Sequence, residues 1–183
     1  DSLSYEMMAD DFNAVLDSLH IDSAYVIGWS DGGINGLLLA MRHPEKVKKL
    51  AETGANLVPD TTVFDPAGNA FVKSSIEALA KQLPDKDAKN GIKLIHMMEV
   101  APNIPAASLR TIKCPVFVIG GDYDVILPAH TLEIFNNLNQ AYLWILPKSG
   151  HATVQRYNTE FNKKVHEFFT QPFTRPQWDD WDK

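Results

Sequence analysis

The chain is poor in cysteine and in basic residues. Cys114 is the only cysteine among 183 residues. It therefore has no partner for a disulfide within the chain, and its position before Pro115 at a strand start predicts a buried apolar role rather than a nucleophilic one. Lys and Arg together number 17 against 23 Asp and Glu, which gives a net charge of −6. This balance predicts no nucleic-acid partner.

Other signatures are missing as well. No apolar run is long enough to span a membrane, so no membrane partner is expected. No residues have metal-ligand spacing, and Gly28-x-x-x-Gly32-Gly33 lacks both the dinucleotide fingerprint and the Lys of a phosphate-binding loop. The sequence therefore predicts no metal and no cofactor. It begins with neither an initiator Met nor a signal peptide, which leaves the compartment open, with the cytoplasm slightly favoured over a secreted or periplasmic parent.

The hydrophobic pattern alternates between short apolar runs and helical stretches, which favours a parallel β-sheet covered by helices. Hydrophobic residues make up 45% of the chain and charged residues 22%, as in ordinary globular proteins. The predicted strands are residues 25–28, 47–53, 116–119 and 141–146. The first helix is expected to be capped by Ser4 and to bury an apolar stripe of Met8, Phe12, Val15, Leu16 and Leu19.

The most informative motif is Gly28-Trp29-Ser30-Asp31-Gly32-Gly33, which lies between an apolar run and a second apolar segment. A strand, a sharp turn and a helix form the context in which the serine of G-x-S-x-G becomes a nucleophile. Gly28 and Gly32 are expected to relieve steric clashes across the turn. The alternative interpretation is that Ser30 merely caps the helix with its side chain.

An acid and a base follow in the order that this architecture requires. Asp124 comes after the strand that ends in Gly120-Gly121, and His151 lies on the loop after the last predicted strand. Because the carboxyl ends of parallel strands share one edge of a sheet, Ser30, Asp124 and His151 are expected to meet there as a catalytic triad. Asp122 competes with Asp124 for the acid role, although it is also suited to satisfying loop N–H groups.

These motifs resemble those of the α/β-hydrolase superfamily, most closely its valacyclovir hydrolase (biphenyl hydrolase-like) branch. The resemblance implies an α/β fold and serine hydrolysis of carboxylic esters without a cofactor, with a small-molecule ester as the partner. It rests on Gly28 to Ile34, Gly54-Ala55-Asn56, Gly120-Gly121-Asp122-Tyr123-Asp124, Gly150-His151 and Glu160-Phe161-Asn162-Lys163.

The resemblance also implies roles for residues around the triad. The N–H of Asp31 is the expected oxyanion-hole donor. The side chain of Asp31 either anchors the ammonium group of an amino-acid ester, as in that branch, or caps the helix. The candidate substrate-binding residues are Asp31, Trp29, Asn56, Met97 and Met98.

Residues 59–110 interrupt the alternation with two predicted helices, near 69–82 and 87–100, and five prolines. By resemblance this segment is a helical cap inserted between two parts of the hydrolase core, 1–58 and 111–171, with a tail at 172–183. The alternative is an enlarged helical crossover. Apolar cap residues either line an acyl pocket or form core, namely Phe71, Ile76, Leu79, Ile95, Met97 and Met98.

The strands that precede the nucleophile strand in the family, and the His-Gly loop that supplies the second oxyanion donor, have no counterpart in the sequence. The chain is therefore expected to be a C-terminal portion of an α/β-hydrolase fold with impaired activity. Its exposed strand edge is expected to pair in a homo-oligomer or with a complementing N-terminal segment. The alternative function is a weakly active or inactive association module.

Overall fold

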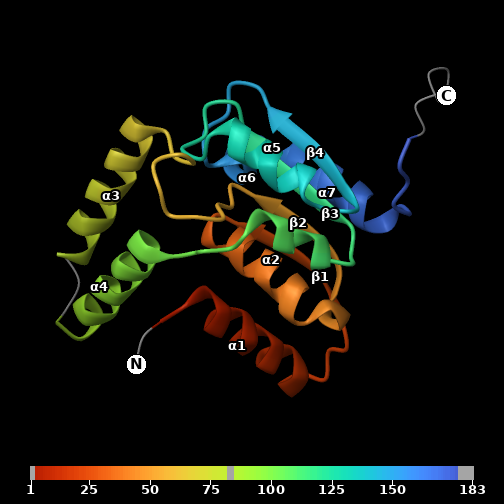
Figure 1. The fold of residues 1–183 in the computed structure, drawn as a ribbon, viewed down its shortest axis with the longest axis horizontal. Helices are drawn as coiled ribbons and strands as arrows, with labels where there is room; N and C mark the ends of the chain where they lie inside the picture. The colour runs from red at the N-terminus through yellow and green to blue at the C-terminus, as the bar shows by residue number, and fades with distance from the viewer. Residues whose placement is uncertain (1–2, 82–84, 177–183) are drawn as a thin grey trace.

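A parallel β-sheet forms the centre of the molecule (Figure 1). The structure, a computed structural model, describes residues 3–81 and 85–176. Within them, four strands pair in the order β1-β2-β3-β4, and every pair is parallel. The strands are β1 (Ala24–Trp29), β2 (Val47–Thr53), β3 (Val116–Gly121) and β4 (Ala141–Leu146). All four strands predicted from the sequence are confirmed, with β1 and β3 extending slightly further.

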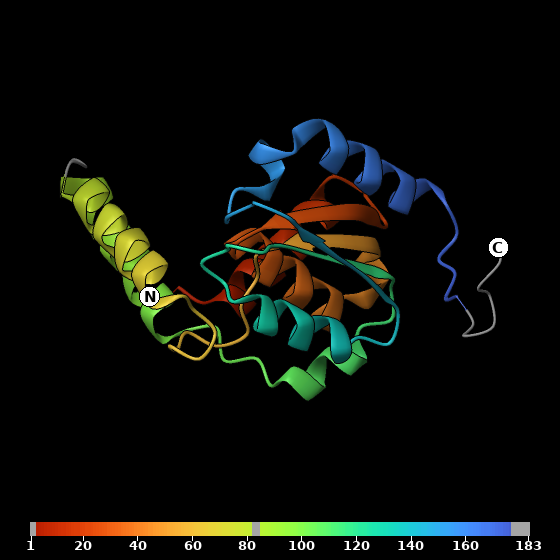
Figure 2. The ribbon, with the colours of Figure 1, turned by 90° about the horizontal axis from the view of Figure 1, so that it is seen from above.

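Helices cover both faces of the sheet (Figure 2). One face packs against α1 (Tyr5–Ser18), α2 (Asp31–Arg42) and α5 (Pro128–Asn136), whereas α6 (Thr153–Arg156) and α7 (Asn158–Thr170) cover the other. Successive strand residues point to opposite faces, so Leu50 joins the core under α2 while Ala51 joins the core under α7. Since β3 is buried along its whole length, its continuous apolar run is explained by burial on both faces.

Helix α1 begins where the sequence predicts. Ser4 is its N-cap, and the Ser4 side chain accepts a hydrogen bond from the N–H of Met7. The predicted apolar stripe is wrong in part, because the fully buried residues are Tyr5 and Ala9. Met8 and Leu16 do pack against the core, but three stripe residues are exposed, namely Phe12, Val15 and Leu19. The side of α1 that meets α2 is thus rotated from the predicted side.

Strand β1 lies at an edge of the sheet formed by the described residues. Its alternate side chains Tyr25, Ile27 and Trp29 are 51%, 55% and 38% exposed. Tyr25 stacks on Phe169 of α7 with the ring centroids 4.8 Å apart, which covers part of one ring. Exposed apolar side chains on an edge strand fit the expected pairing with a second copy or a complementing segment, which stays a prediction.

The segment between β2 and β3 forms a helical hairpin that projects from the sheet body (Figures 1 and 2). It consists of α3 (Pro66–Ala80) and α4 (Asp85–Val100), so the two helices predicted there are confirmed. The described residues also include two 3₁₀ helices, η1 (Pro44–Lys46) and η2 (Ala106–Thr111). The described helices include none long and apolar enough to cross a membrane.

The beginning of the C-terminal tail is fastened to β4. The hydroxyl of Tyr142 donates a hydrogen bond to the carbonyl oxygen of Thr174 over 2.6 Å, and the ring of Phe173 packs against the Tyr142 ring. The tryptophans of the predicted tail, Trp178 and Trp181, lie outside the described residues.

Candidate active site

Ser30 occupies the sharp turn between β1 and α2. Its backbone has φ 55° and ψ −121°, a conformation that residues other than glycine rarely adopt and that costs about 1–3 kcal/mol. The turn is held because the Ser30 N–H donates to the carbonyl of Thr53, while the N–H of Gly33 donates to the Ser30 carbonyl. The Ser30 side chain makes no capping hydrogen bond. The helix-cap interpretation of this hydroxyl is therefore wrong.

The two elbow glycines differ in what they do. A β-carbon at position 28 would lie 2.2 Å from the carbonyl oxygen of Gly32, which the backbone cannot accommodate. A β-carbon at position 32 would meet nothing within 4 Å. The predicted steric role is thus confirmed for Gly28 and wrong for Gly32. The turn brings the backbone of residue 32 over residue 28, but a side chain on residue 32 itself would point into open space.

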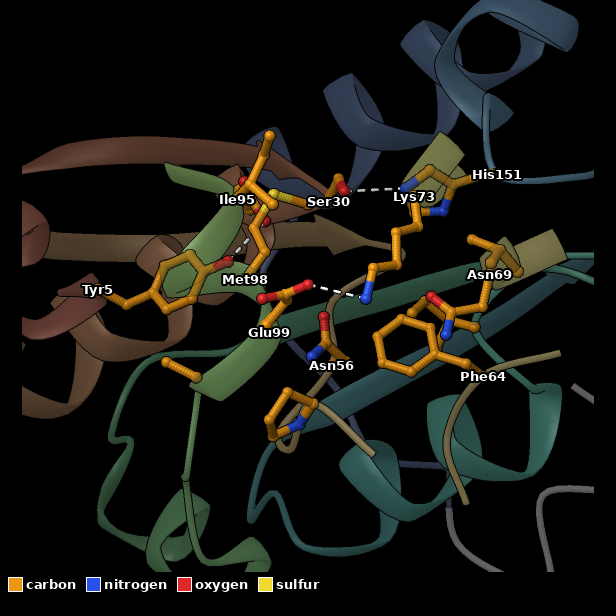
Figure 3. Close-up of a pocket in the computed structure, with 15 residues that line it drawn as sticks. Tyr5, Ser30, Asn56, Phe64, Asn69, Lys73, Ile95, Met98, Glu99 and His151 are labelled. Atoms are coloured by element: carbon orange, nitrogen blue, oxygen red, sulfur yellow. Dashed lines mark hydrogen bonds and ion pairs between the residues drawn. The ribbon is translucent and has the colours of Figure 1, made fainter. Parts of the chain in front are cut away.

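Hydrogen bonds join the three residues predicted to form the triad, and Figure 3 shows the one between Ser30 and His151. His151 Nε2 lies 2.9 Å from Ser30 Oγ, and His151 Nδ1 lies 2.7 Å from Asp124 Oδ1. Since a carboxylate only accepts, the His151 Nδ1–H donates to Asp124, and Nε2 is left to accept the Ser30 hydroxyl proton. The indole of Trp29 donates to the His151 carbonyl over 2.8 Å and holds the histidine loop.

The two acids after β3 have separate partners. Asp124 is 4% exposed, and its Oδ1 also accepts from the N–H of Ile126. Asp122 instead accepts from the N–H of Ser149 over 3.0 Å. Partial burial acts in the opposite direction, but hydrogen bonds from the backbone of Lys148 and Ser149 lower the pKa of Asp122. Asp122 thus organises the loop before His151, and Asp124 is the acid that reaches the imidazole.

A cavity of about 430 Å³ opens beside Ser30 and His151 (Figure 3). Its walls come from the elbow, from the loop after β2 and from the helical hairpin, which contributes Asn69, Lys73, Ile95, Met98 and Glu99. Lys73 Nζ and Glu99 Oε1 form an ion pair across the two hairpin helices over 2.8 Å. Also in the cavity wall, the hydroxyl of Tyr5 donates to Asp31 Oδ1 over 2.8 Å.

The predicted substrate-binding residues divide into two groups. Asp31, Asn56 and Met98 line the cavity. Met97 is a wrong prediction, because it is 3% exposed in the core, on a different side of α4 from Met98. Trp29 does not line the cavity either, since its indole is held against the histidine loop. Ile95 is the one other pocket candidate that lines the cavity, whereas the side chains of Phe71, Ile76 and Leu79 are not among those that the structure describes.

Sequence reasoning missed three features of the site. The first is Tyr5, which lies in the first turn of α1 and belongs to no recognisable motif. The second is the Lys73–Glu99 ion pair, which depends on how α3 and α4 pack against each other. Burial, with the charge and hydrogen bond of Asp31, raises the pKa of Tyr5, which keeps its hydroxyl a donor. The third feature is Glu52. The sequence did contain a signal for it, because a lone acid interrupts the apolar β2 run Leu50-Ala51-Glu52-Thr53.

Glu52 is a buried carboxyl close to the candidate triad. It is 1% exposed, and its Oε2 accepts from the N–H of Ala55 over 3.3 Å. Burial raises the pKa of Glu52 to about 8, with a further contribution from the charge of Asp124. Glu52 is therefore mainly protonated at neutral pH.

Two other titratable side chains have structural surroundings. His130 is 4% exposed, its Nε2 accepts from the N–H of Leu57, and burial lowers its pKa. Burial raises the pKa of the Cys114 thiol to about 11, and Cys114 packs against the core, as its predicted apolar role requires. Among the described residues, no three His, Cys, Asp or Glu side chains are grouped so as to hold a metal ion.

Comparisons with known proteins agree with this architecture. The model of the α/β-hydrolase fold family matches residues 1–73. Together with the parallel sheet and the flanking helices, this match and the relatives described next support an α/β-hydrolase superfamily assignment.

Particular relatives include the serine hydrolase BPHL of Homo sapiens and of Mus musculus, with 26% and 24% identity over 90% of this chain. The chain spans 60% of the length of each of these two proteins. A putative carbamate hydrolase RutD of Caulobacter is 27% identical over 89% of the chain and 71% of its own length.

Solved structures share the fold at lower identity. A putative non-heme bromoperoxidase BpoC of Mycobacterium tuberculosis has a TM-score of 0.72 and 22% identity, over 92% of this chain and 75% of its own. MGS-M2, an α/β hydrolase from a deep-sea metagenome, has a TM-score of 0.77 and 18% identity, over 97% and 76%.

Replacing Gly28 by alanine is expected to lower the free energy of unfolding by about 3 kcal/mol or more, because the new methyl group would overlap backbone atoms that cannot move apart. Gly32→Ala is the matched control and should change stability by less than about 1 kcal/mol, since its methyl group enters open space in a helical turn. Urea unfolding measures both values. Equal losses in the two variants would contradict this account of the elbow.

Glu52→Gln is expected to gain stability relative to the parent as pH rises. Below pH 4.5, the ordinary pKa of Glu, the folded and unfolded parent are both protonated; between 4.5 and about 8 only the folded state keeps the proton, so parental stability falls through that window. The advantage of the variant should grow by about 2–4 kcal/mol from pH 5 to pH 8 in urea unfolding. An advantage that stays constant with pH would show that Glu52 is already ionised.

Proposed function

We propose that the chain is a serine hydrolase that cleaves small carboxylic esters through an acyl-enzyme. The observation that carries the proposal is the continuous hydrogen-bonded path from Asp124 through His151 to Ser30, beside an open cavity. A hydroxyl 2.9 Å from an imidazole that a carboxylate orients is the arrangement that activates a serine. The name of the BPHL relatives, serine hydrolase, supports the same chemistry.

The first half of the reaction forms the acyl-enzyme. His151 Nε2 takes the hydroxyl proton as Ser30 Oγ attacks the ester carbonyl carbon, and Asp124 stabilises the imidazolium that results. The oxyanion accepts a hydrogen bond from the N–H of Asp31, the first residue of α2, where backbone donors have no partner within the helix. His151 then returns the proton to the alcohol, which leaves.

The second half removes the acyl group. A water molecule gives a proton to His151 as its oxygen attacks the acyl carbonyl, and the collapse of the second tetrahedral intermediate returns the proton to Ser30. The acid is released. His151 accepts or donates the proton in every transfer step of this reaction.

The hairpin of α3 and α4 serves in this proposal as a cap over the reacting centre, because it provides one wall of the cavity. At that wall, the positive charge of Lys73 and the negative charge of Glu99 neutralise each other in an ion pair. Asp31 has no cationic partner among the described residues, since its recorded side-chain partner is the Tyr5 hydroxyl. An ammonium group on the acyl part of the substrate would supply the missing cation, which favours amino-acid esters.

A second candidate function is an association module that keeps the triad residues but turns over slowly. The exposed edge of β1 favours it, and so does the single oxyanion donor identified, because one missing donor costs about 100-fold to 1000-fold in rate. Stable folding without hydrolysis, and without labelling by an active-site reagent, would favour this alternative.

Ser30→Ala is expected to lower kcat/KM for p-nitrophenyl acetate and butyrate by at least about 1000-fold, because no other hydroxyl replaces the nucleophile. A fluorophosphonate reagent should label the parent at Ser30 and leave the variant unlabelled, with mass spectrometry locating the adduct. Hydrolysis that survives in Ser30→Ala, with an unchanged circular dichroism spectrum, would rule out Ser30 as the nucleophile.

Asp31→Asn is expected to reduce the preference for an alanyl ester over the propionyl ester of the same alcohol by about 10-fold, because it removes a charge-assisted contact to the ammonium group. The ratio of the two kcat/KM values is the measurement, so general damage to the elbow cancels. Tyr5→Phe is the matched control, since it removes the hydrogen bond to Asp31 but keeps the charge. An unchanged ratio in Asp31→Asn would show that this carboxylate does not anchor the amino group.

A further inference from the structure

Two buried carboxyl oxygens at the candidate triad have no hydrogen-bond partner among the described residues. One is Oε1 of Glu52 and the other is Oδ2 of Asp124. Their residues are only 1% and 4% exposed, so water from the bulk does not reach either group freely. Buried polar atoms are nearly always hydrogen-bonded, so these two atoms require an explanation.

The fold brings both side chains to the loop that follows β2. Glu52 lies on β2 in register with Val118 of β3, and Asp124 follows the end of β3. Glu52 Oε2 lies under the first turn of α2, where it would be 3.4 Å from a β-carbon on Gly33. Asp124 Oδ2 lies 3.6 Å from the position of a β-carbon on Gly54, two residues beyond Glu52. The loop after β2 therefore adjoins both carboxyl groups.

The surroundings of Glu52 decide its protonation state. Neighbouring strands place Gly28 and Val118 beside it, α2 places Gly33, and the following loop places Ala55, none of which titrates. The charged group that acts on it is Asp124, which itself contacts His151. Burial and this negative charge raise the pKa of Glu52 to about 8. A protonated carboxyl has one O–H donor, and Asp124 Oδ2 is a buried acceptor near it that has no partner among the described residues.

We propose that Glu52 is a positioning residue for the triad, which in its neutral form donates its carboxyl proton to Asp124 Oδ2, directly or through one water molecule. The inference rests on the proposed function for its effect on turnover. Asp124 Oδ1 already accepts from His151 and Ile126. A donor on Oδ2 fixes the remaining rotation of the carboxylate, and so fixes the direction in which it holds the imidazole. Ionised Glu52 would lose the donor and repel Asp124.

Two substitutions separate this role from simple packing. Glu52→Gln keeps an N–H donor for Asp124 and an acceptor for the Ala55 N–H, so kcat should stay within about threefold of the parent at pH 7. Glu52→Met fills the space without a donor, and kcat should fall by about 10-fold to 100-fold with little change in KM. The melting temperature of Glu52→Met should nevertheless rise, because an apolar side chain replaces a buried carboxyl.

The pH profile supplies a second signature. The parent should lose kcat above about pH 8, whereas Glu52→Gln should keep its activity there because the amide does not titrate. Glu160→Gln and Glu160→Met are the matched controls, since Glu160 is an exposed acid on α7. Both should follow the parent at every pH. A Glu52→Met variant with parental kcat and a parental pH profile would overturn the proposal and leave the serine hydrolase function standing.

A measurement that needs no turnover distinguishes the positioning role of Glu52 from the serine hydrolase proposal. In a Ser30→Ala background, the His151 Nδ1 proton that faces Asp124 is expected to give a low-field NMR resonance, which Glu52→Met should displace and Glu52→Gln should leave in place. If the parent neither hydrolyses esters nor reacts with the fluorophosphonate, the hydrolase proposal fails. The NMR resonance then tests by itself whether Glu52 positions Asp124. Identical resonances in both variants would overturn the inference. If Glu52→Met does not fold, the comparison of the parent with Glu52→Gln at pH 7 and pH 9 decides instead.

Discussion

The hydrogen bond between His151 Nε2 and Ser30 Oγ is the interaction on which the functional interpretation depends. Its two residues are far apart in the chain, and it forms because β1, β3 and β4 run parallel with their carboxyl ends at one edge of the sheet. The remaining contacts of the site help to maintain the distance between these two atoms. Trp29 ties down the histidine loop, and Asp122 fixes the turn before it. Asp124 sets the direction of the imidazole ring, so that a nitrogen and not a ring carbon meets the hydroxyl.

The elbow shows how stability is given up for geometry. A positive φ at Ser30 is unfavourable for a residue with a side chain, and the surroundings hold it in place through the carbonyl of Thr53 and through the close approach of residues 28 and 32. The same turn points the hydroxyl away from the helix end that it would otherwise cap. A serine that capped α2 would satisfy a backbone donor, but its oxygen would then be turned away from the imidazole.

What the sequence predicted depended on whether the signal was local. The strands, Ser4 as a helix cap and the elbow each follow from a few neighbouring residues, and the order of Ser30, Asp124 and His151 carried over because strand ends in a parallel sheet share an edge. Predictions failed where packing between distant segments decides. Met97 and Met98 are adjacent on α4, yet one lies in the core and the other in the cavity wall, which depends on how the hairpin meets the body. No pattern in the sequence pairs Tyr5 with Asp31.

Glu52 illustrates why a buried carboxyl is retained where leucine or methionine would pack more favourably. An isolated acid in the core costs free energy in either protonation state, through lost hydration when neutral and through a still larger penalty when charged. The reason proposed for a carboxyl at this position is its neighbour Asp124, an acid that contacts the imidazole of His151. In the proposed arrangement, Glu52 lies outside the cavity lining, so substrate does not compete for its proton. In the proposed arrangement, Asp124 receives its last hydrogen bond from a buried side chain of β2.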